Sequence, residues 1–362
     1  MIKKIRESNF EFLRIYSIFC ILLGHIIIHS NLLNITTGIT NIVLSFILCF
    51  IIIHVNLFML ITGYFQYDKQ FKIKKLIVLI LEIFFYNFVL TILFDFTKIV
   101  NLSSFELLLK SSFFNMTSYW FIVNYIILYC LSPFINKLIK AISKKEHLYL
   151  ISILSLIFFV FPYLFLGRFN VNNGYNLEQF IIMYFIGSYI NKYKFELPNY
   201  NNKKKIYLIS FIVCIVINFI LYFVSSRFNN ALFFQIKNHI FDYSNPIVVI
   251  QSISLFMLVG TFKFKSRLIN TISASTLGIY LIHENEFTRN NLYTWIGFKN
   301  KNIEQNFSLF IKLFAWTIIL FIIFFIIDYL RIIIIENNSY YQKMINCFSE
   351  MFNKKGVKHE KN

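Results

Sequence analysis

The 362-residue chain is 57% apolar and only 14% charged, whereas soluble domains contain about 25% charged residues. Its apolar residues form blocks of roughly 17–22, the length that a helix needs to cross a hydrocarbon core of about 30 Å. These properties exclude a soluble protein and indicate one unit embedded in a lipid bilayer. The formal net charge of +18 does not indicate a nucleic-acid partner, because the basic residues lie in short loops between apolar blocks, as in membrane proteins.

The pattern predicts an all-α fold, a polytopic transmembrane helical bundle of about ten spans with cytoplasmic N- and C-termini. The basic segment Met1–Arg6 resembles the start of a signal peptide, but the apolar block after it is too long and lacks a cleavage site, so we interpret it as a retained span. The predicted spans are Phe10–Ser30, Asn41–Phe65, Leu76–Phe94, Tyr119–Ile135, Leu148–Leu166, Glu178–Ile190, Ile206–Val224, Pro246–Phe262, Ile269–His283 and Phe307–Asp328. Residues 1–335 then form the membrane domain, and residues 336–362 form a basic cytoplasmic tail.

The distribution of basic residues supports this orientation. With the N-terminus inside, the inner segments contain 25 of the 35 Lys and Arg residues, and the outer loops contain 8. An excess of Lys and Arg in cytoplasmic loops is the usual signal of membrane topology. The alternation holds along the whole chain, so it supports the predicted number of spans as well as their direction.

Arg14 and His25 are ionisable residues within the first span, where such side chains are costly and therefore candidates for function. They are eleven residues apart, which at about 100° per residue places them on nearly the same helix face, roughly 16 Å apart along the axis. Arg14 is thus expected near the cytoplasmic boundary and His25 beyond the midplane. This arrangement suits an anionic cytosolic ligand whose reactive end enters the membrane. The alternatives are that Arg14 only extends to the headgroups and that His25 is a structural imidazole.

Three further polar residues lie within predicted spans. His29 could form a metal-binding His-x-x-x-His pair with His25, but it lies close to the outer interface and no third ligand is evident, so we expect no metal. His54 is expected to pack or to form hydrogen bonds. Glu82 is expected to form a structural ion pair, with a place in the functional site as the second interpretation.

His283 and Glu284 end the ninth predicted span at the outer surface, where an acceptor molecule would arrive. A histidine at this interface can also be merely solvated. We therefore regard both residues as candidates for an outer part of the site.

Several segments of the chain resemble the membrane-bound acyltransferase-3 family. In its first span, this family has an Arg or Lys followed by a His at the spacing of Arg14 and His25. Further similar segments, in the order of the family, are Leu57–Tyr64 at the end of the second span, Tyr119–Ile122 with Tyr129 and Pro133 behind it, and Ser275–His283 with the pattern S-x-x-x-I-Y-L-x-H. The resemblance extends from Phe10 to about Asp328 and identifies the membrane domain as an acyltransferase domain.

The resemblance implies transfer of an acyl group, usually acetyl, from cytosolic acyl-CoA, the donor, to a hydroxyl of an extracytoplasmic or lipid-linked glycan at a bacterial cytoplasmic membrane. On the donor side, Arg14, Lys72 and Lys75 would bind the phosphates of the nucleotide. Many members have Arg-x-x-Arg where this chain has Lys72-Ile-Lys-Lys75, so the loop keeps its charge but loses the planar fork of arginine.

On the acceptor side, His25 would act as general base for the hydroxyl or would carry the acyl group transiently. His283 would assist at the outer mouth, with Glu284 beside it. Tyr119 and Trp120 could stack against a sugar, although aromatic residues are also common at membrane interfaces. Arg14, His25 and His283 are thus the predicted catalytic residues.

Two other functions remain as alternatives. A flippase for lipid-linked oligosaccharides would also be a basic polytopic protein, but it would have a water-filled cavity with several charged spans. A glycan polymerase would more often have a long outer loop with Arg and acidic residues, and the longest predicted outer loops, Asp95–Ser118 and Ser225–Asn245, are poor in Arg.

Overall fold

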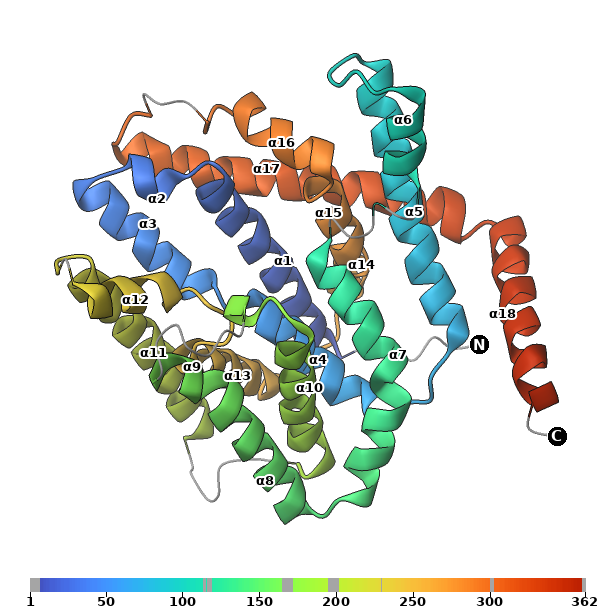
Figure 1. Ribbon diagram of the computed structural model, residues 1–362, viewed down its shortest axis with the longest axis horizontal. Helices are drawn as coiled ribbons and strands as arrows, with labels where there is room; N and C mark the ends of the chain where they lie inside the picture. Colours follow the sequence, from blue (N-terminus) through green and yellow to red (C-terminus); the bar gives the residue numbers. More distant parts are fainter. Residues whose placement is uncertain are drawn as a thin grey trace.

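The computed structural model describes residues 7–112, 115, 119–164, 172–194, 202–228, 230–299 and 303–359. Every regular element in this part of the chain is a helix (Figure 1). The longer helices are α1 (Ser8–His29), α3 (Gly38–Ile51), α4 (His54–Gln66), α5 (Ile73–Phe96), α7 (Trp120–Ala141), α8 (Lys144–Ser155), α10 (Leu177–Lys192), α11 (Lys203–Ser225), α13 (Pro246–Gly260), α17 (Phe307–Arg331) and α18 (Ser339–His359). The shorter helices are α2 (Leu32–Ile35), α6 (Ser104–Ser111), α9 (Phe161–Leu164), α12 (Ala231–His239), α14 (Arg267–Ala274), α15 (Thr276–His283) and α16 (Glu286–Trp295). The prediction of an all-α fold is confirmed for these residues.

Within the described residues, 7 helical stretches are long and apolar enough to cross a membrane, so the chain is a multi-pass membrane protein. They are Ser8–His29, Gly38–Gln66, Ile73–Phe96, Trp120–Ala141, Lys144–Leu164, Lys203–Ser225 and Phe307–Glu336. The predicted spans Glu178–Ile190 and Pro246–Phe262 correspond to the shorter helices α10 and α13. The predicted span Ile269–His283 is divided at Ser275 into α14 and α15. The number of ten spans and their orientation therefore stay predictions.

Helix α1 runs through the middle of the bundle, with α17 on one side and α3 and α4 on the other (Figure 1). Its first turns, with Phe10 and Leu13, belong to one apolar core, and its later turns, from Ile18 to Ile27, belong to a second. Because α1 is packed on several sides, many of its side chains are buried within the bundle, including the polar Ser17.

Helices α4 and α10 cross so closely that their backbones are in contact. A Cβ atom on Gly63 would lie 2.2 Å from the carbonyl oxygen of Tyr184, and one on Gly187 would lie 2.3 Å from that of Leu60. Glycine at these two positions is therefore required for the crossing, which is a common device for helix packing in membranes.

A buried network of charges joins α5 to α17. Arg331 donates to Asp328 Oδ1 at 2.7 Å and to Glu82 Oε1 at 2.9 Å, and Tyr86 donates to Asp328 Oδ1 at 2.7 Å. The prediction that Glu82 forms an ion pair is confirmed. Arg331 belongs to α17 and is buried, whereas the sequence placed it among the charges of an inner loop.

The predicted basic tail contains the helix α18. It follows a π-helical segment, Ile332–Glu336, and packs against α5. Lys74 of α5 donates a hydrogen bond of 2.7 Å to Asn346 of α18. The tail thus begins as a packed helix of the bundle.

Candidate active site

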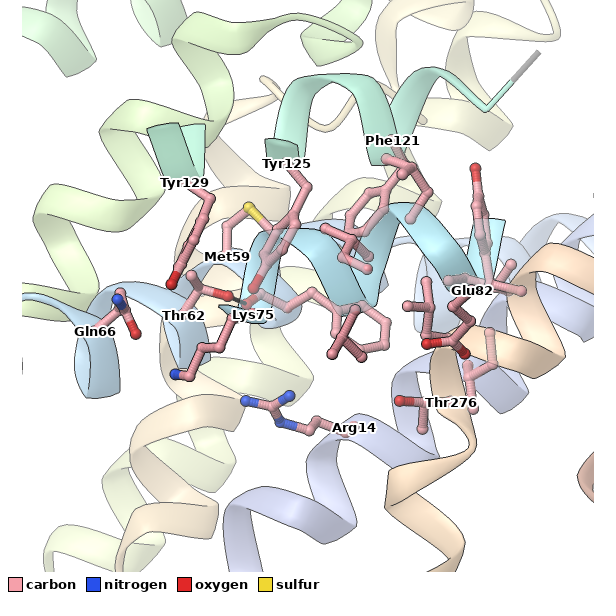
Figure 2. Close-up of a pocket in the computed structure, with 18 residues that line it drawn as sticks. Arg14, Met59, Thr62, Gln66, Lys75, Glu82, Phe121, Tyr125, Tyr129 and Thr276 are labelled. Carbon is pink, nitrogen blue, oxygen red and sulfur yellow. Dashed lines mark hydrogen bonds between the residues drawn. The ribbon is translucent and has the colours of Figure 1, made fainter. Parts of the chain in front are cut away.

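A cavity of about 310 Å³ runs along one face of α1 (Figure 2). Its volume is within the range of roughly 300–1,000 Å³ that is usual for small-molecule sites. From α1 it is lined by Arg14, Ile18 and Ile21, and the next residue on this face of the helix is His25. The other lining residues come from α4, α5, α7 and α15 and include Met59, Thr62, Lys75, Glu82, Phe121, Tyr125, Thr276 and Tyr280.

A second cavity, of about 840 Å³, opens from the Arg14 end of the first and is the more polar of the two. The two cavities share Arg14, Thr62, Gln66, Lys75 and Tyr125 among their lining residues. In Figure 2, the side chains of Arg14 and Lys75 reach the end of the pocket nearest Gln66, whereas Glu82 and Thr276 lie toward its other end. Together the cavities form one path. Its mouth is net basic, because it is lined by Arg14, Lys69, Lys75 and Lys194 and by the acidic residues Glu7, Glu11 and Asp68.

Two basic residues of the mouth, Lys69 and Lys194, are not among the predicted site residues. Lys72, which is among them, does not line either cavity in the described part of the chain. Its backbone instead exchanges hydrogen bonds with the hydroxyl of Tyr129, at 3.1 and 3.2 Å. Spacing in the sequence could not separate these lysines, because all of them lie within short polar loops or next to them.

Further along α1 from the first cavity, His25 lies in a cluster of ionisable side chains. Its Nδ1 is 3.1 Å from His283 Nε2 and 2.9 Å from Glu284 Oε1. His29 Nε2 is 3.3 Å from the same Glu284 oxygen. The structure thus brings together the two predicted catalytic histidines and Glu284, although 258 residues separate His25 from His283 along the chain.

The hydrogen bonds in this cluster determine which nitrogen of His25 can accept a proton. His283 Nδ1 lies 2.7 Å from the carbonyl oxygen of Ile279, so we assign the proton of His283 to Nδ1 and a lone pair to Nε2. His25 Nδ1 must then carry a proton to donate to His283, and the nearby carboxylate of Glu284 favours the same tautomer. The free lone pair of His25 is consequently on Nε2, on a side chain that is 19% exposed.

Glu284 is held by its own surroundings. It is buried, and Arg289 Nη1 lies 3.4 Å from its Oε2. The next residue, Asn285, is the N-cap of α16 and accepts a hydrogen bond from the backbone N–H of Phe287. Because a cap fixes the start of a helix, the carboxylate of Glu284 has a defined position beside His25.

The two aromatic residues predicted to stack on a sugar differ in their surroundings. Tyr119 is completely buried, and its hydroxyl lies within hydrogen-bonding distance of Asn87 Oδ1 and of the Leu281 carbonyl oxygen, at 3.1 and 3.2 Å. Its ring therefore has no open face in this structure. Trp120 is half-buried and lies 4.6 Å from the ring of Tyr175 and 6.0 Å from that of Tyr243, measured between centroids.

Tyr280 lies between the first cavity and His283. It lines the cavity, and its ring centroid lies 5.7 Å from that of His283 and 5.7 Å from that of Phe121. Tyr280 is not among the predicted site residues, although it is three residues before His283, a spacing that places both on one side of a helix. This spacing is the sequence signal from which Tyr280 could have been predicted as a neighbour of His283.

His54 lies outside the cluster. Its ring nitrogens are 2.9 Å from the Ile51 carbonyl oxygen and 2.9 Å from the Tyr243 hydroxyl. The prediction that it forms structural hydrogen bonds is confirmed.

The sequence shows no third ligand for a metal beside His25 and His29. In the structure, Glu284 supplies one, and ligand atoms of His25, His29 and Glu284 all lie within 4.8 Å of one another. Periodicity within α1 could find the histidine pair, but it could not show that a residue of a distant loop reaches it.

Comparison with known proteins agrees with this geometry. The family model described as an acyltransferase domain, of the acyltransferase-3 type, matches residues 7–335, which include the basic mouth, the cavity and the histidine cluster. No curated protein and no solved structure matches the chain. Because the family model covers most of the sequence, the chain belongs to the acyltransferase-3 family.

Proposed function

We propose that the protein transfers an acyl group, acetyl in the simplest case, from cytosolic acyl-CoA to a hydroxyl of an extracytoplasmic or lipid-linked glycan, in a bacterial cytoplasmic membrane. The observation that carries the proposal is the position of His25. It follows Arg14, Ile18 and Ile21 on the face of α1 that lines the cavity, and it is paired with Glu284 at 2.9 Å.

The basic mouth is suited to the donor. Arg14 and Lys75 lie where the two cavities meet, and Lys69 and Lys194 line the wider one. These cations would hold the phosphates of acyl-CoA, and the narrower cavity would take the slender arm that ends in the thioester. Tyr280 lines this path and contacts His283, so the thioester would have to pass its side chain to reach His25.

His25 would then act as general base. Its Nε2 takes the proton of the acceptor hydroxyl, the hydroxyl oxygen attacks the thioester carbonyl carbon, the C–S bond breaks, and the CoA thiolate leaves and takes up a proton. The imidazolium that forms transiently is stabilised by the carboxylate of Glu284, and His283 keeps the Nδ1 proton of His25 in place. An acceptor sugar would approach from the side of Trp120 and Tyr175.

The dimensions of the cavity do not favour transport of an oligosaccharide. A flippase must accommodate several sugar rings along its whole path, whereas the part of this path nearer to His25 has a volume of about 310 Å³ and is lined mainly by apolar side chains. That volume and lining suit a chain such as the arm of acyl-CoA.

The test is acyl transfer by the purified protein in proteoliposomes, with acetyl-CoA and the glycan of the host cell, read as acetyl esters by NMR. His25→Gln should reduce the rate by about 10²–10⁴-fold, the usual contribution of a general base, because glutamine cannot accept and return a proton. Glu284→Gln should also reduce the rate, because the imidazolium loses its counter-charge.

His54→Gln is the matched control, since it also removes a buried imidazole but one that is bonded to Ile51 and Tyr243. It should keep most of the activity at equal amounts of folded protein. A fully active His25→Gln variant would exclude this mechanism.

A further inference from the structure

The cluster around His25 also has the composition and spacing of a metal site. His25 and His29 lie one turn apart on α1, and Glu284 Oε1 lies 2.9 and 3.3 Å from their nearest nitrogens. His283 Nε2 lies 3.1 Å from His25 Nδ1 and 4.0 Å from Glu284 Oε1. In tetrahedral zinc sites with bonds of about 2.0–2.1 Å, the ligand atoms are roughly 3.3 Å apart. The ligand atoms of His25, His29 and Glu284 all lie within 4.8 Å of one another, so small side-chain adjustments would place these three around one ion. His283 Nε2, which is close to two of them, would move in as the fourth ligand.

Two of the four atoms are not satisfied within the described part of the chain. His29 Nε2 and Glu284 Oε1 are buried and make no hydrogen bond of good geometry, although they are close to each other. Glu284 is only 4% exposed, so its oxygen cannot be satisfied by bulk water. A buried carboxylate oxygen surrounded by imidazole nitrogens is what a divalent cation would satisfy.

The outer contacts of the cluster are also those of a metal site. The proton on His283 Nδ1 is directed to the Ile279 carbonyl oxygen at 2.7 Å, which leaves Nε2 free to bind a metal. Arg289 contacts the second oxygen of Glu284 at 3.4 Å. Such partners fix the orientation of histidine and carboxylate ligands and raise metal affinity.

We propose that His25, His29, His283 and Glu284 bind one Zn²⁺ ion, and that this ion inhibits the enzyme. Three imidazole nitrogens and one carboxylate oxygen form a donor set that Zn²⁺ prefers. The inhibition rests on the function proposed above. A metal on His25 Nδ1 requires the lone pair of that nitrogen, so the proton of the neutral ring must be on Nε2, and the lone pair that would accept the hydroxyl proton is lost.

His29 allows binding and catalysis to be separated. It is a proposed metal ligand, but it has no part in the acyl-transfer mechanism. His29→Gln should therefore keep the basal activity while losing Zn²⁺ binding and inhibition. His54→Gln, which removes a histidine outside the cluster, should bind Zn²⁺ as the wild type does.

Binding is measured directly on the full chain, purified in detergent after treatment with a chelator, by isothermal titration with Zn²⁺ and by the visible absorption of Co²⁺ as a tetrahedral probe. The wild type and His54→Gln should bind one ion per chain, and His29→Gln should bind at least about tenfold more weakly. No stoichiometric binding by the wild type, or equal binding by His29→Gln, would overturn the site.

Acyl transfer is then measured with and without Zn²⁺ in the same variants. Inhibition of the wild type and of His54→Gln, but not of His29→Gln, supports the regulatory part of the proposal, and activation by Zn²⁺ would overturn it. If the wild type has no acyltransferase activity at all, the proposed function fails, but the titrations still decide whether the metal site exists.

Discussion

Gly278 of α15 packs directly against Asp328 of α17, which makes the contact between these helices sensitive to a single methyl group. A Cβ atom at position 278 would lie 2.0 Å from Asp328 Oδ1 and 2.7 Å from Asp328 Cβ. Carbon and oxygen atoms that are not bonded need a separation of about 3.4 Å or more. Gly278→Ala must therefore displace the Asp328 carboxylate, or the backbone of one helix, by roughly 1.5 Å.

The expected loss of stability follows from the partners of that carboxylate. Its Oδ1 accepts hydrogen bonds from Tyr86 and from Arg331, each at 2.7 Å, and a shift of this size breaks both. Hydrogen bonds to charged groups contribute about 1.5–3 kcal/mol each, and inserting a methyl group into a packed interior costs about 1–3 kcal/mol. Arg331 keeps Glu82 as a partner, so we expect a total of about 4–5 kcal/mol, at the lower end of the sum.

The assay is reversible unfolding in mixed detergent micelles, or the thermal midpoint where unfolding is irreversible. Gly260→Ala is the matched control, since a Cβ atom there would meet only Phe10 Cζ at an ordinary 3.7 Å. In an Asp328→Ala background, Gly278→Ala should cost less, because the two nearest atoms, Oδ1 and Cγ of Asp328, are removed and only its Cβ, at 2.7 Å, remains. Equal midpoints for Gly278→Ala and Gly260→Ala would refute the reasoning.

Two further predictions concern the donor and the topology. Lys75→Gln should weaken binding of acyl-CoA in detergent by about tenfold or more, and Arg14→Lys should have a smaller effect because the charge remains. Lys72→Gln, at a position that lines neither cavity, should have the smallest effect. Equal effects of Lys72→Gln and Lys75→Gln would contradict the proposal that the mouth of the cavity binds acyl-CoA. Reporter fusions after Asn34, Asn172 and Asn291 should be extracytoplasmic, and those after Lys72, Lys204 and Lys265 cytoplasmic; a cytoplasmic result at Asn172 would contradict the ten-span topology.

The helical fold and one face of the site were predictable because both depend on regular periods. Apolar blocks of sufficient length identify membrane helices, and the spacing of Arg14 and His25 fixes their positions on one helix. The structure places Arg14, Ile18 and Ile21 along one cavity, in line with His25. No knowledge of neighbouring helices was needed for this prediction.

The partners of these residues were not predictable, because a helical period does not show which helix packs against which face. His25 contacts His283 and Glu284 only because the chain breaks at Ser275 and places the short helix α15 beside α1. Arg331 was misplaced for a related reason. The excess of basic residues in inner segments is a property of whole loops, and it cannot show that one arginine is buried against Glu82.

Because α15 is short, a shift of the helix at the contact between Gly278 and Asp328 should also move His283. The two residues are five positions apart in one helix of 8 residues, about 7.5 Å along its axis, so a displacement at Gly278 is transmitted with little loss. His283 holds the Nδ1 proton of His25 through a contact of 3.1 Å, which a shift of roughly 1.5 Å would break. At temperatures below its unfolding midpoint, Gly278→Ala should consequently still have a lower rate of acyl transfer per folded molecule than the wild type. Gly260→Ala should have the wild-type rate. Full specific activity of folded Gly278→Ala would show that a displacement at Gly278 does not move His283 away from His25.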